Sequence, residues 1–270
     1  MERYLVFGYA AASTRADLAR LVDVVAEHAD VPVVARRFAS YEELTRAVGA
    51  RVVDLAWLPP IAFIAVERDG LVVPLASPAR GAAGEASLGF TSVIVVPRRS
   101  LALGLRDLVG CRAAWVDPFS ASGYVLPRLE LDGAGVALAS FASETFYGAH
   151  VEVVRAVATG QADFGGTYAT YGPRGEIVRS AWRERPDLAA GVRVLARVGS
   201  LPSEVIAARS DMPAALQTVL TRALVATSRD SRNRALLHEA LGADELKPWK
   251  APGYDLLRTE TERAAVAGLI

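Results

Sequence analysis

The sequence predicts an α/β protein with two lobes, each built on a largely parallel β-sheet. Short runs of β-branched and aromatic residues alternate with longer amphipathic stretches, which is typical of β/α units. The length of 270 residues suits two domains of ~150 residues each. The alternation restarts after a long apolar strand at residues 90–97. We therefore expect hinge strands near residues 90–96 and 200–205, with a ligand cleft at the interface between the lobes.

The first lobe is predicted from the alternation before residue 91. Two capping-box patterns, at Thr14 and Asp17 and at Ser40 and Glu43, each predict the start of a helix, because the hydroxyl and the carboxylate satisfy unpaired backbone N–H groups. The expected elements are strands at residues 4–9, 31–38, 52–58 and 71–75, helices at residues 14–28, 40–49 and from residue 59, and a loop around Gly81, Gly84 and Gly89.

The second lobe repeats this alternation, and the chain then returns to the first lobe. The expected elements of the second lobe are strands at residues 90–97, 112–116, 136–141, 162–167 and 192–198 and helices at residues 100–108, from 123, 150–159 and 177–183. A strand at residues 204–208 and helices at residues 214–228, 232–241 and 254–267 follow. The predicted boundaries assign residues 1–91 and 201–270 to lobe 1 and residues 92–200 to lobe 2.

Charge balance and the scarcity of metal-binding residues exclude several classes of function. Lysine plus arginine and aspartate plus glutamate each total 30, which argues against a nucleic-acid-binding domain that depends on net positive charge. The longest apolar stretch, residues 55–66, contains two prolines and is shorter than the ~20 residues of a transmembrane helix. With one cysteine and three widely spaced histidines, we expect no disulfide, metal or other cofactor.

One segment, Asp117–Tyr124, joins the end of a strand to the start of a helix. The strand stops at Asp117, and small hydroxyl residues lead into a helix that begins at Gly123. The first N–H groups of a helix lack intrahelical partners and carry partial positive charge, so helix N-termini bind anions. Ser120 and Ser122 would add hydroxyl donors. The alternative is that either serine is only an N-cap.

Five motifs, taken in order along the chain, extend this argument. They are Tyr41-Glu42-Glu43-Leu44 with Val53-Asp54-Leu55-Ala56-Trp57; Gly89-Phe90-Thr91-Ser92-Val93-Ile94-Val95-Val96; Asp117-Pro118-Phe119-Ser120-Ala121-Ser122-Gly123-Tyr124; Gly148-Ala149-His150 with Ala156-Val157-Ala158-Thr159-Gly160-Gln161-Ala162-Asp163; and Leu201-Pro202-Ser203-Glu204. Together they resemble the phosphate/phosphite/phosphonate-binding proteins of ABC importers, a branch of the type 2 periplasmic binding proteins. The resemblance covers most of the chain and implies a two-lobed clamp around a small oxyanion.

The resemblance also implies which residues contact the ligand. In the second lobe the oxyanion would be held by the turn residues Ser120, Ala121, Ser122 and Gly123. Tyr41 matches the aromatic hydroxyl that the family contributes from the first lobe, and His150 matches the histidine of the second lobe. Glu204 matches an acidic residue that can meet an amino group on the ligand in phosphonate binders.

Three positions depart from the pattern of the family. Phe90 stands where the family often has a hydroxyl-bearing aromatic on the hinge strand, and Ala121 stands where it has the central threonine of the turn. Thr170 stands where aminophosphonate binders have a carboxylate. Two hydroxyls and one acid are therefore absent, which argues against an aminoalkylphosphonate or a tightly held phosphate. We expect Glu204 to select ligands with a P–OH or an amino group, because a carboxylate near an anion must accept a hydrogen bond or pair with a cation.

Each of these residues also has a purely structural interpretation. Tyr41 could pack its ring on a neighbouring strand, and Glu204 could be a solvated acid. His150 could be a partly exposed residue at a helix start, where the helix dipole disfavours its cation. Trp57, at the end of a strand, is expected to pack in the core rather than to stack on a ligand.

The sequence predicts a solute-binding protein that performs no chemistry. Its partners would be an ABC permease or a sensor protein, and we expect a monomer. One alternative is an enzyme on the same bilobal fold, similar to chorismate dehydratases or thiamin-precursor synthases. Against the enzyme, no Ser/His/Asp set is visible, and the only lysines, Lys247 and Lys250, lie near the C-terminus. Another alternative is a ligand-sensing module that docks on a regulator.

The N-terminus bears on localisation. Residues 1–9 lack the apolar core and cleavage site of a secretory signal, and this absence leaves the localisation open: a chain complete as written would be cytoplasmic. Removal of a leader from a longer precursor would place the protein in the periplasm or cell envelope.

Overall fold

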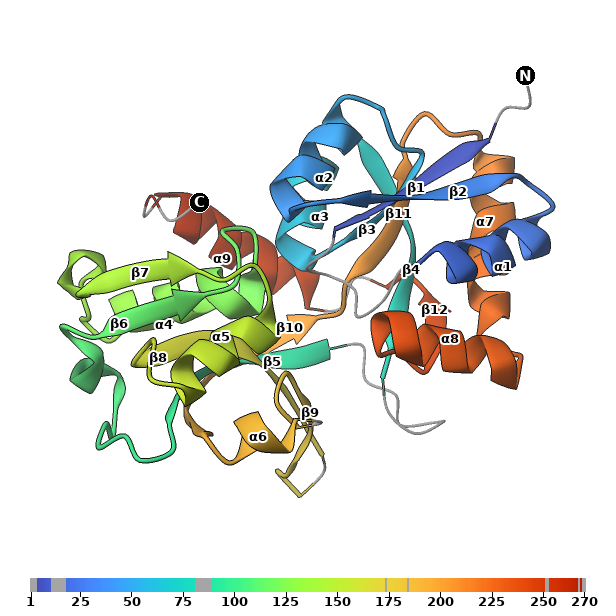
Figure 1. Ribbon diagram of the computed structural model, residues 1–270. Coiled ribbons are helices and arrows are strands. Elements are labelled where there is room, and N and C mark those ends of the chain that lie inside the picture. The colour runs from blue at the N-terminus through green and yellow to red at the C-terminus, as the bar shows by residue number, and fades with distance from the viewer. Residues whose placement is uncertain are drawn as a thin grey trace. The chain divides into compact units, whose positions relative to one another are not determined.

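The computed structural model describes residues 4–10, 18–80, 89–172, 174–183, 185–250, 253–266 and 268. The chain forms two compact units, each with its own sheet (Figure 1). Unit 1 consists of Met1–Gly89 and Pro202–Pro252, and unit 2 consists of Phe90–Leu201 and Gly253–Ile270. The chain therefore passes from one unit to the other three times.

The division into units differs from the predicted lobes mainly at the C-terminus. The predicted boundaries at 91/92 and 200/201 lie close to the crossings after Gly89 and Leu201. The segment from Gly253 onward belongs to unit 2, whereas it was expected in lobe 1. Its helix α9 (Tyr254–Val266) lines a pocket together with Leu126 and Val198 of unit 2. The packing of α9 beside Leu126 and Val198 assigns it to unit 2. Sequence periodicity does not encode this packing.

Unit 1 is built on a six-stranded mixed sheet with the order β12-β4-β11-β3-β1-β2. Strand β1 is parallel to β2 and β3, whereas β11 is antiparallel to β3 and β4 and β12 is antiparallel to β4. Because β11 lies between β3 and β4, it joins parts of unit 1 that are distant in sequence. The strands are β1 (Leu5–Ala10), β2 (Val33–Phe38), β3 (Leu55–Leu58), β4 (Val72–Ala79), β11 (Val205–Arg209) and β12 (Glu245–Pro248).

Helices cover both faces of this sheet. They are α1 (Ala19–Ala29), α2 (Tyr41–Gly49), α3 (Pro60–Arg68), α7 (Ala214–Thr227) and α8 (Ser231–Leu241). Helices α1, α7 and α8 share one core with Phe7 of β1 and Trp57 of β3. Trp57 is fully buried there, as predicted. On the other face α2 approaches β1 so closely that a Cβ at Gly8 would lie 2.9 Å from Leu44 Cδ1, which explains the glycine.

The predicted capping box at the start of α2 is present in slightly altered form. Ser40 Oγ accepts a hydrogen bond from the backbone N–H of Glu43 at 3.1 Å. The Glu43 carboxylate accepts one from the N–H of Ala39 at 2.8 Å, rather than from Ser40 itself. Both bonds satisfy donors that the helix start would leave unpaired. The helix spans Tyr41–Gly49, as predicted.

Unit 2 is built on a second mixed sheet, with the order β10-β5-β8-β6-β7 and with β9 paired to β8. Strands β5 and β9 are antiparallel to β8, whereas β6 is parallel to β7 and β8. The strands are β5 (Gly89–Pro97), β6 (Arg112–Trp115), β7 (Ser143–Phe146), β8 (Phe164–Tyr171), β9 (Ile177–Ser180) and β10 (Val192–Pro202). The α-helices are α4 (Leu126–Gly133), α5 (His150–Ala158), α6 (Pro186–Ala189) and α9.

Two consecutive glycines of β8 show which segment covers which face of this sheet. A Cβ at Gly165 would lie 2.6 Å from Val153 Cγ1 of α5, and a Cβ at Gly166 would lie 2.9 Å from the carbonyl oxygen of Gly123. Successive side chains of a strand point to opposite faces. Helix α5 therefore covers one face, and the predicted anion-binding turn lies on the other.

Three predicted elements of the second lobe were wrong. The strand expected at residues 136–141 contains a short 3₁₀ helix (Leu138–Ser140), and strand β7 follows it. The helix expected at 177–183 begins as strand β9, and the one expected at 100–108 is only a 3₁₀ turn (Leu105–Leu108). In short apolar runs, periodicity does not separate strand from helix, and pairing with a neighbouring strand decides. The predictions at Thr14, Asp17, Gly81 and Gly84 lie outside the described residues.

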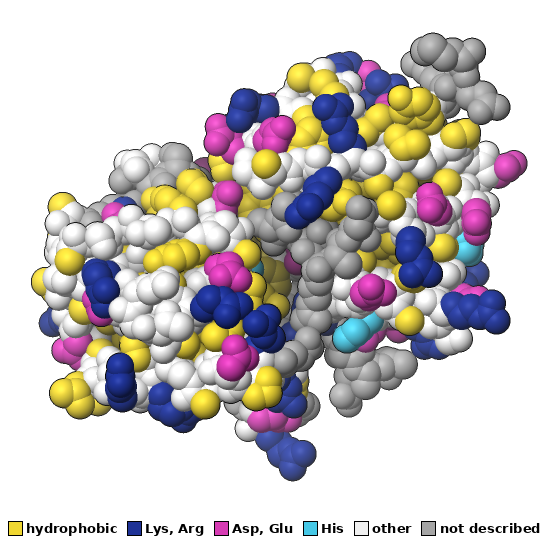
Figure 2. Space-filling model, in the orientation of Figure 1, with side chains coloured by type: hydrophobic (Ala, Val, Ile, Leu, Met, Phe, Trp, Pro, Cys, Tyr) yellow, Lys and Arg dark blue, Asp and Glu magenta, His cyan; other side chains and the backbone are white. Residues whose placement is uncertain are grey.

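The distribution of charged side chains on the surface reflects the balanced composition of the chain. Basic and acidic side chains are interspersed over the visible face (Figure 2), in keeping with a formal net charge of zero. No helix in the described ranges is long and apolar enough to cross a membrane.

Candidate functional site

The predicted anion-binding segment is a tight turn of unit 2 between β6 and α4. Asp117 Oδ1 accepts a hydrogen bond from the N–H of Phe119 at 2.8 Å, and Ser120 Oγ accepts one from the N–H of Gly123 at 3.1 Å. One π-helical turn, η3 (Ala121–Val125), then continues directly into α4. Single π-helical turns of this kind occur frequently at functional sites.

Ser120 and Ser122 are both 3% exposed, but their hydroxyl groups have different roles. Ser120 is the N-cap, as the structural interpretation proposed. Among the described residues, the Ser122 hydroxyl and the backbone N–H groups of Ala121 and Ser122 form no hydrogen bond. These three groups are therefore the donors with which the turn can bind an oxyanion.

Gly123 and Ser92 hold the turn in place. A Cβ at position 123 would lie 2.3 Å from Val116 Cγ2, so only glycine fits there. The Ser92 hydroxyl of β5 donates a hydrogen bond to the Ser122 carbonyl oxygen at 3.0 Å, in a buried position. Because these contacts already fix the donors, little ordering is needed when a ligand binds.

Aromatic and charged side chains pack behind this turn. The Tyr124 ring stacks edge-on against Trp115 with a centroid separation of 5.7 Å, and the Arg128 guanidinium lies 5.4 Å from the Tyr124 centroid. Arg128 is also ion-paired with Glu144, which accepts a hydrogen bond from Trp115 Nε1 at 2.8 Å. Burial raises the pKa of the Tyr124 phenol, so the ring acts as a neutral packing group that supports the start of α4.

His150 lies beside the middle of β8. As the first residue of α5, it places Nδ1 3.2 Å from Thr167 Oγ1, and its ring is edge-on to Tyr168 at a centroid separation of 4.9 Å. Strand β6 pairs with β8 only as far as Gly165, and β9 pairs with it only from Ala169 onward. The imidazole contacts the two residues of β8, Thr167 and Tyr168, that lie between these pairings. His150 therefore contacts Thr167 and Tyr168 of β8, and the turn lies against Gly166 of the same strand.

Phe90 and Thr170 lie on the same face of the sheet as the turn. In the β5–β8 register Ser92 is opposite Tyr168, and the Phe90 and Tyr168 ring centroids are 5.9 Å apart. Thr170 is opposite Arg179 of β9, whose Cζ lies 5.6 Å from the Tyr168 centroid. Thr170 Oγ1 is buried and has no hydrogen-bond partner within the described segments.

Tyr41 and Glu204, the other two predicted residues, belong to unit 1. Tyr41 begins α2 and is buried, with 4% of its surface exposed. The Glu204 side chain is 19% exposed and forms an ion pair with Arg80, with Oε1 3.1 Å from Nη2 and Oε2 2.9 Å from Nη1. Arg80 also donates to Ser203 Oγ at 3.2 Å and to the Leu241 carbonyl oxygen at 3.3 Å. Glu204 is therefore a mostly buried, paired acid rather than a solvated one.

Four residues with a part in these arrangements were missed by the sequence analysis: Arg80, Thr167, Tyr168 and Arg179. The predicted strand ended at residue 167, whereas β8 continues to Tyr171. Following its alternation further would have placed Tyr168 and Thr170 on the same face as Gly166. Arg179 was missed because residues 177–183 were predicted as a helix, whereas Arg179 lies in strand β9. The pairing of Arg80 with Glu204 joins residues far apart in the sequence, and no local pattern predicts it.

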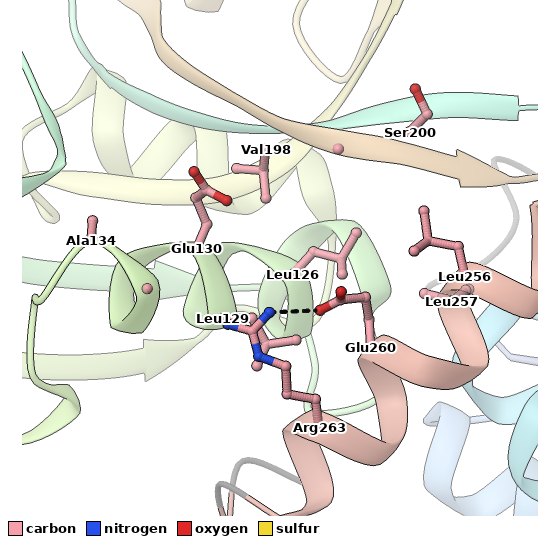
Figure 3. Close-up of a pocket in the computed structure, with 12 residues that line it drawn as sticks. Leu126, Leu129, Glu130, Ala134, Val198, Ser200, Leu256, Leu257, Glu260 and Arg263 are labelled. Atoms are coloured by element: carbon pink, nitrogen blue, oxygen red, sulfur yellow. Dashed lines mark hydrogen bonds and ion pairs between the residues drawn. The ribbon is translucent and has the colours of Figure 1, made fainter.

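Other features of the structure do not coincide with the predicted site. A pocket of about 400 Å³ lies within unit 2 between α4, β10 and α9, where Glu260 and Arg263 form an ion pair at 3.3 Å (Figure 3). None of the predicted ligand residues lines it. Within the described ranges no three metal-ligating side chains cluster.

The two α/β units have the fold of a periplasmic binding protein. In unit 1 the strand β11 lies between β3 and β4, and in unit 2 a turn capped by Ser120 joins β6 to α4. The model of the family described as ABC transporter, phosphonate, periplasmic substrate-binding protein matches residues 7–254. The chain belongs to this family. No curated protein is similar enough in sequence to count as a match.

Solved structures agree with this fold at low sequence identity. PhnD1 from Prochlorococcus marinus in complex with methylphosphonate has a TM-score of 0.80 and 16% identity, with 99% of each chain covered. XAC2383 from Xanthomonas citri bound to ATP has a TM-score of 0.79 and 19% identity, covering 97% of this chain and 98% of that chain. A binding protein component of an ABC phosphonate transporter from Pseudomonas aeruginosa has a TM-score of 0.77 and 17% identity, covering 99% and 89%.

Proposed function

We propose that this protein binds a small phosphonate-type oxyanion and delivers it to the permease of an ABC importer, without changing the ligand chemically. The observation that carries the proposal is the rigid turn at Ser120–Gly123. It combines two N–H groups and one hydroxyl that have no partner among the described residues with a conformation held by Gly123 and Ser92. Neutral donors in a fixed arrangement suit an oxyanion.

His150 supports this proposal from the adjacent helix. The start of α5 disfavours an imidazolium cation, so His150 would act as a neutral hydrogen-bond donor from one ring nitrogen. Which nitrogen carries the proton depends on the contact with Thr167 Oγ1. A ligand held by N–H groups, a hydroxyl and an imidazole is recognised by its oxygen geometry.

The remaining predicted residues enter the proposal through the family resemblance. Tyr41 would contribute its hydroxyl, and Glu204, oriented by Arg80, would meet a polar group of the ligand. The absence of enzymatic activity is also part of the proposal, and it is supported by a family composed of substrate-binding proteins. We further propose that the protein acts as a monomer.

A thermal-shift screen over methylphosphonate, phosphite, phosphate and sulfate tests the proposal. A ligand at ~100 times its Kd stabilises the folded state by about 2.7 kcal/mol, so methylphosphonate or a similar anion should raise the Tm by several degrees. Phosphorus NMR on the bound anion should return an unchanged spectrum after release, whereas new resonances would favour the enzyme. If none of the anions raises the Tm, the proposed function is wrong.

A further inference from the structure

Tyr168 is the point at which four parts of unit 2 meet. Its ring is edge-on to His150 of α5, edge-on to Phe90 of β5, and covered by the Arg179 guanidinium of β9. Tyr168 is only partly buried, and one of its neighbours, His150, is a predicted ligand residue. The arrangement thus places an arginine next to the group of residues proposed to hold the oxyanion.

The strand register puts Arg179 on the same face as the turn. Gly166, Tyr168 and Thr170 alternate along β8 on one face, and Gly166 lies directly beneath the Gly123 carbonyl. Tyr168 follows Gly166 by two residues, or roughly 7 Å along a strand. Arg179 is opposite Thr170, and paired residues of neighbouring strands share a face. Its guanidinium therefore lies on the turn's face of the sheet, held over the Tyr168 ring by a cation–π contact.

We propose that Arg179 is a specificity-determining residue, whose positive charge makes the site favour anionic phosphonates without an ammonium group over aminoalkylphosphonates. This inference rests on the proposed function. Electrostatic attraction between partly buried charges extends over distances of about 10 Å in a protein, where the effective dielectric is far below that of water. An arginine at this place attracts the oxyanion and repels a ligand ammonium group.

The test compares two ligands that share a phosphonate head, methylphosphonate and 2-aminoethylphosphonate. Isothermal calorimetry should show that wild-type protein binds methylphosphonate more tightly. Arg179→Met should weaken methylphosphonate by about tenfold, which corresponds to 1.4 kcal/mol, and should weaken 2-aminoethylphosphonate less. The ratio of the two affinities should then shrink. Arg179→Lys keeps the charge and should restore much of the ratio, which a purely structural role would not predict.

A matched control comes from the same sheet. Arg197 covers the ring of Tyr171 with its Cζ 3.6 Å from the centroid, but Tyr171 packs against the core on the α5 side. Arg197→Met removes a comparable contact and should leave the affinity ratio unchanged. Should Arg179→Met fold poorly by circular dichroism, Arg179→Gln provides a second uncharged variant.

The outcomes separate the inference from the proposed function. If wild-type protein binds neither ligand, this inference fails, and the proposed function fails with it only when none of the four anions of the thermal-shift screen raises the Tm. If wild-type protein binds methylphosphonate but Arg179→Met or Arg179→Gln changes both affinities equally, or neither, the role of Arg179 is wrong while the proposed function stands. The proposed role of Arg179 would also be wrong if Arg197→Met changed the ratio of the two affinities as much as Arg179→Met does.

Discussion

Ser120 and Ser122, two positions apart in the candidate turn, differ in the hydrogen bonds of their hydroxyl groups. Ser120 uses its hydroxyl to cap the N–H of Gly123, so the side chain stabilises the turn itself. The Ser122 hydroxyl forms no hydrogen bond to any described residue, which leaves it available to a ligand. The two identical side chains thus have different hydrogen bonding, because Ser120 accepts from a backbone N–H and Ser122 does not.

This difference predicts distinct effects of two alanine variants. Ser120→Ala should lower the free energy of unfolding by about 1 kcal/mol, because it removes an N-cap. Ser122→Ala should leave the free energy of unfolding nearly unchanged and lower methylphosphonate affinity by about tenfold or more, because a hydrogen bond to a charged group contributes roughly 1.5–3 kcal/mol. Urea unfolding and calorimetry measure the two quantities. Equal effects of both variants on both quantities would contradict the assignment.

At the scale of elements, the Arg80–Glu204 pair connects three segments of unit 1. Arg80 follows β4, Glu204 precedes β11, and the Leu241 carbonyl that Arg80 also contacts ends α8. The Arg80 side chain is 6% exposed and that of Glu204 is 19% exposed. In such surroundings, the charge of either partner is tolerated only because the other is present.

Removal of the arginine alone should therefore be more harmful than removal of both charges. Arg80→Met is expected to lower the free energy of unfolding by about 3–5 kcal/mol, because it removes the buried guanidinium that pairs with the mostly buried Glu204 carboxylate. The double variant, which combines Arg80→Met with Glu204→Gln, should lose much less of the free energy of unfolding. Arg51→Met is the control, because the Arg51–Asp211 pair is well exposed and such pairs contribute ~0–1 kcal/mol. Urea unfolding of the ligand-free protein decides. If Arg80→Met matches the control, the ion pair does not stabilise unit 1.

At the scale of the whole molecule, the chain builds two units that each have their own sheet and core. Three crossings connect them, and unit 1 is completed only when β11 enters its sheet between β3 and β4. The N-terminal and C-terminal parts of unit 1 therefore depend on each other for a continuous sheet. The donor groups of the candidate turn all belong to unit 2, where β8 supports them.

Hydrogen exchange over the whole chain should locate the ligand. The N–H groups of Ala121 and Ser122, which have no partner among the described residues, should exchange rapidly without ligand and slowly with saturating methylphosphonate. Peptides from the pocket between α4 and α9 serve as an internal reference and should change little. Protection confined to that pocket would move the binding site away from the turn.

Sequence alone determined the alternating architecture, the capping of α2 at Ser40 and the position of the candidate turn. Each of these depends on residues close together in the chain, whose hydrogen bonds and periodicity are local. The identity of the turn could also be inferred early, because a strand end, small hydroxyl residues and a glycine follow each other directly. The distinct roles of Ser120 and Ser122 could not, since they depend on how the π-helical turn orients two nearly equivalent side chains.

Tertiary structure alone decided which distant residues meet. Arg80 and Glu204 are far apart in sequence and pair because β4 and β11 are neighbours in one sheet. Arg179 reaches Tyr168 because its segment pairs with β8 as a strand, although its local pattern favoured a helix. The last helix joins unit 2 through its packing beside α4 and β10. In each case the deciding free energy comes from burial and pairing between segments distant in the chain, and no local pattern records it.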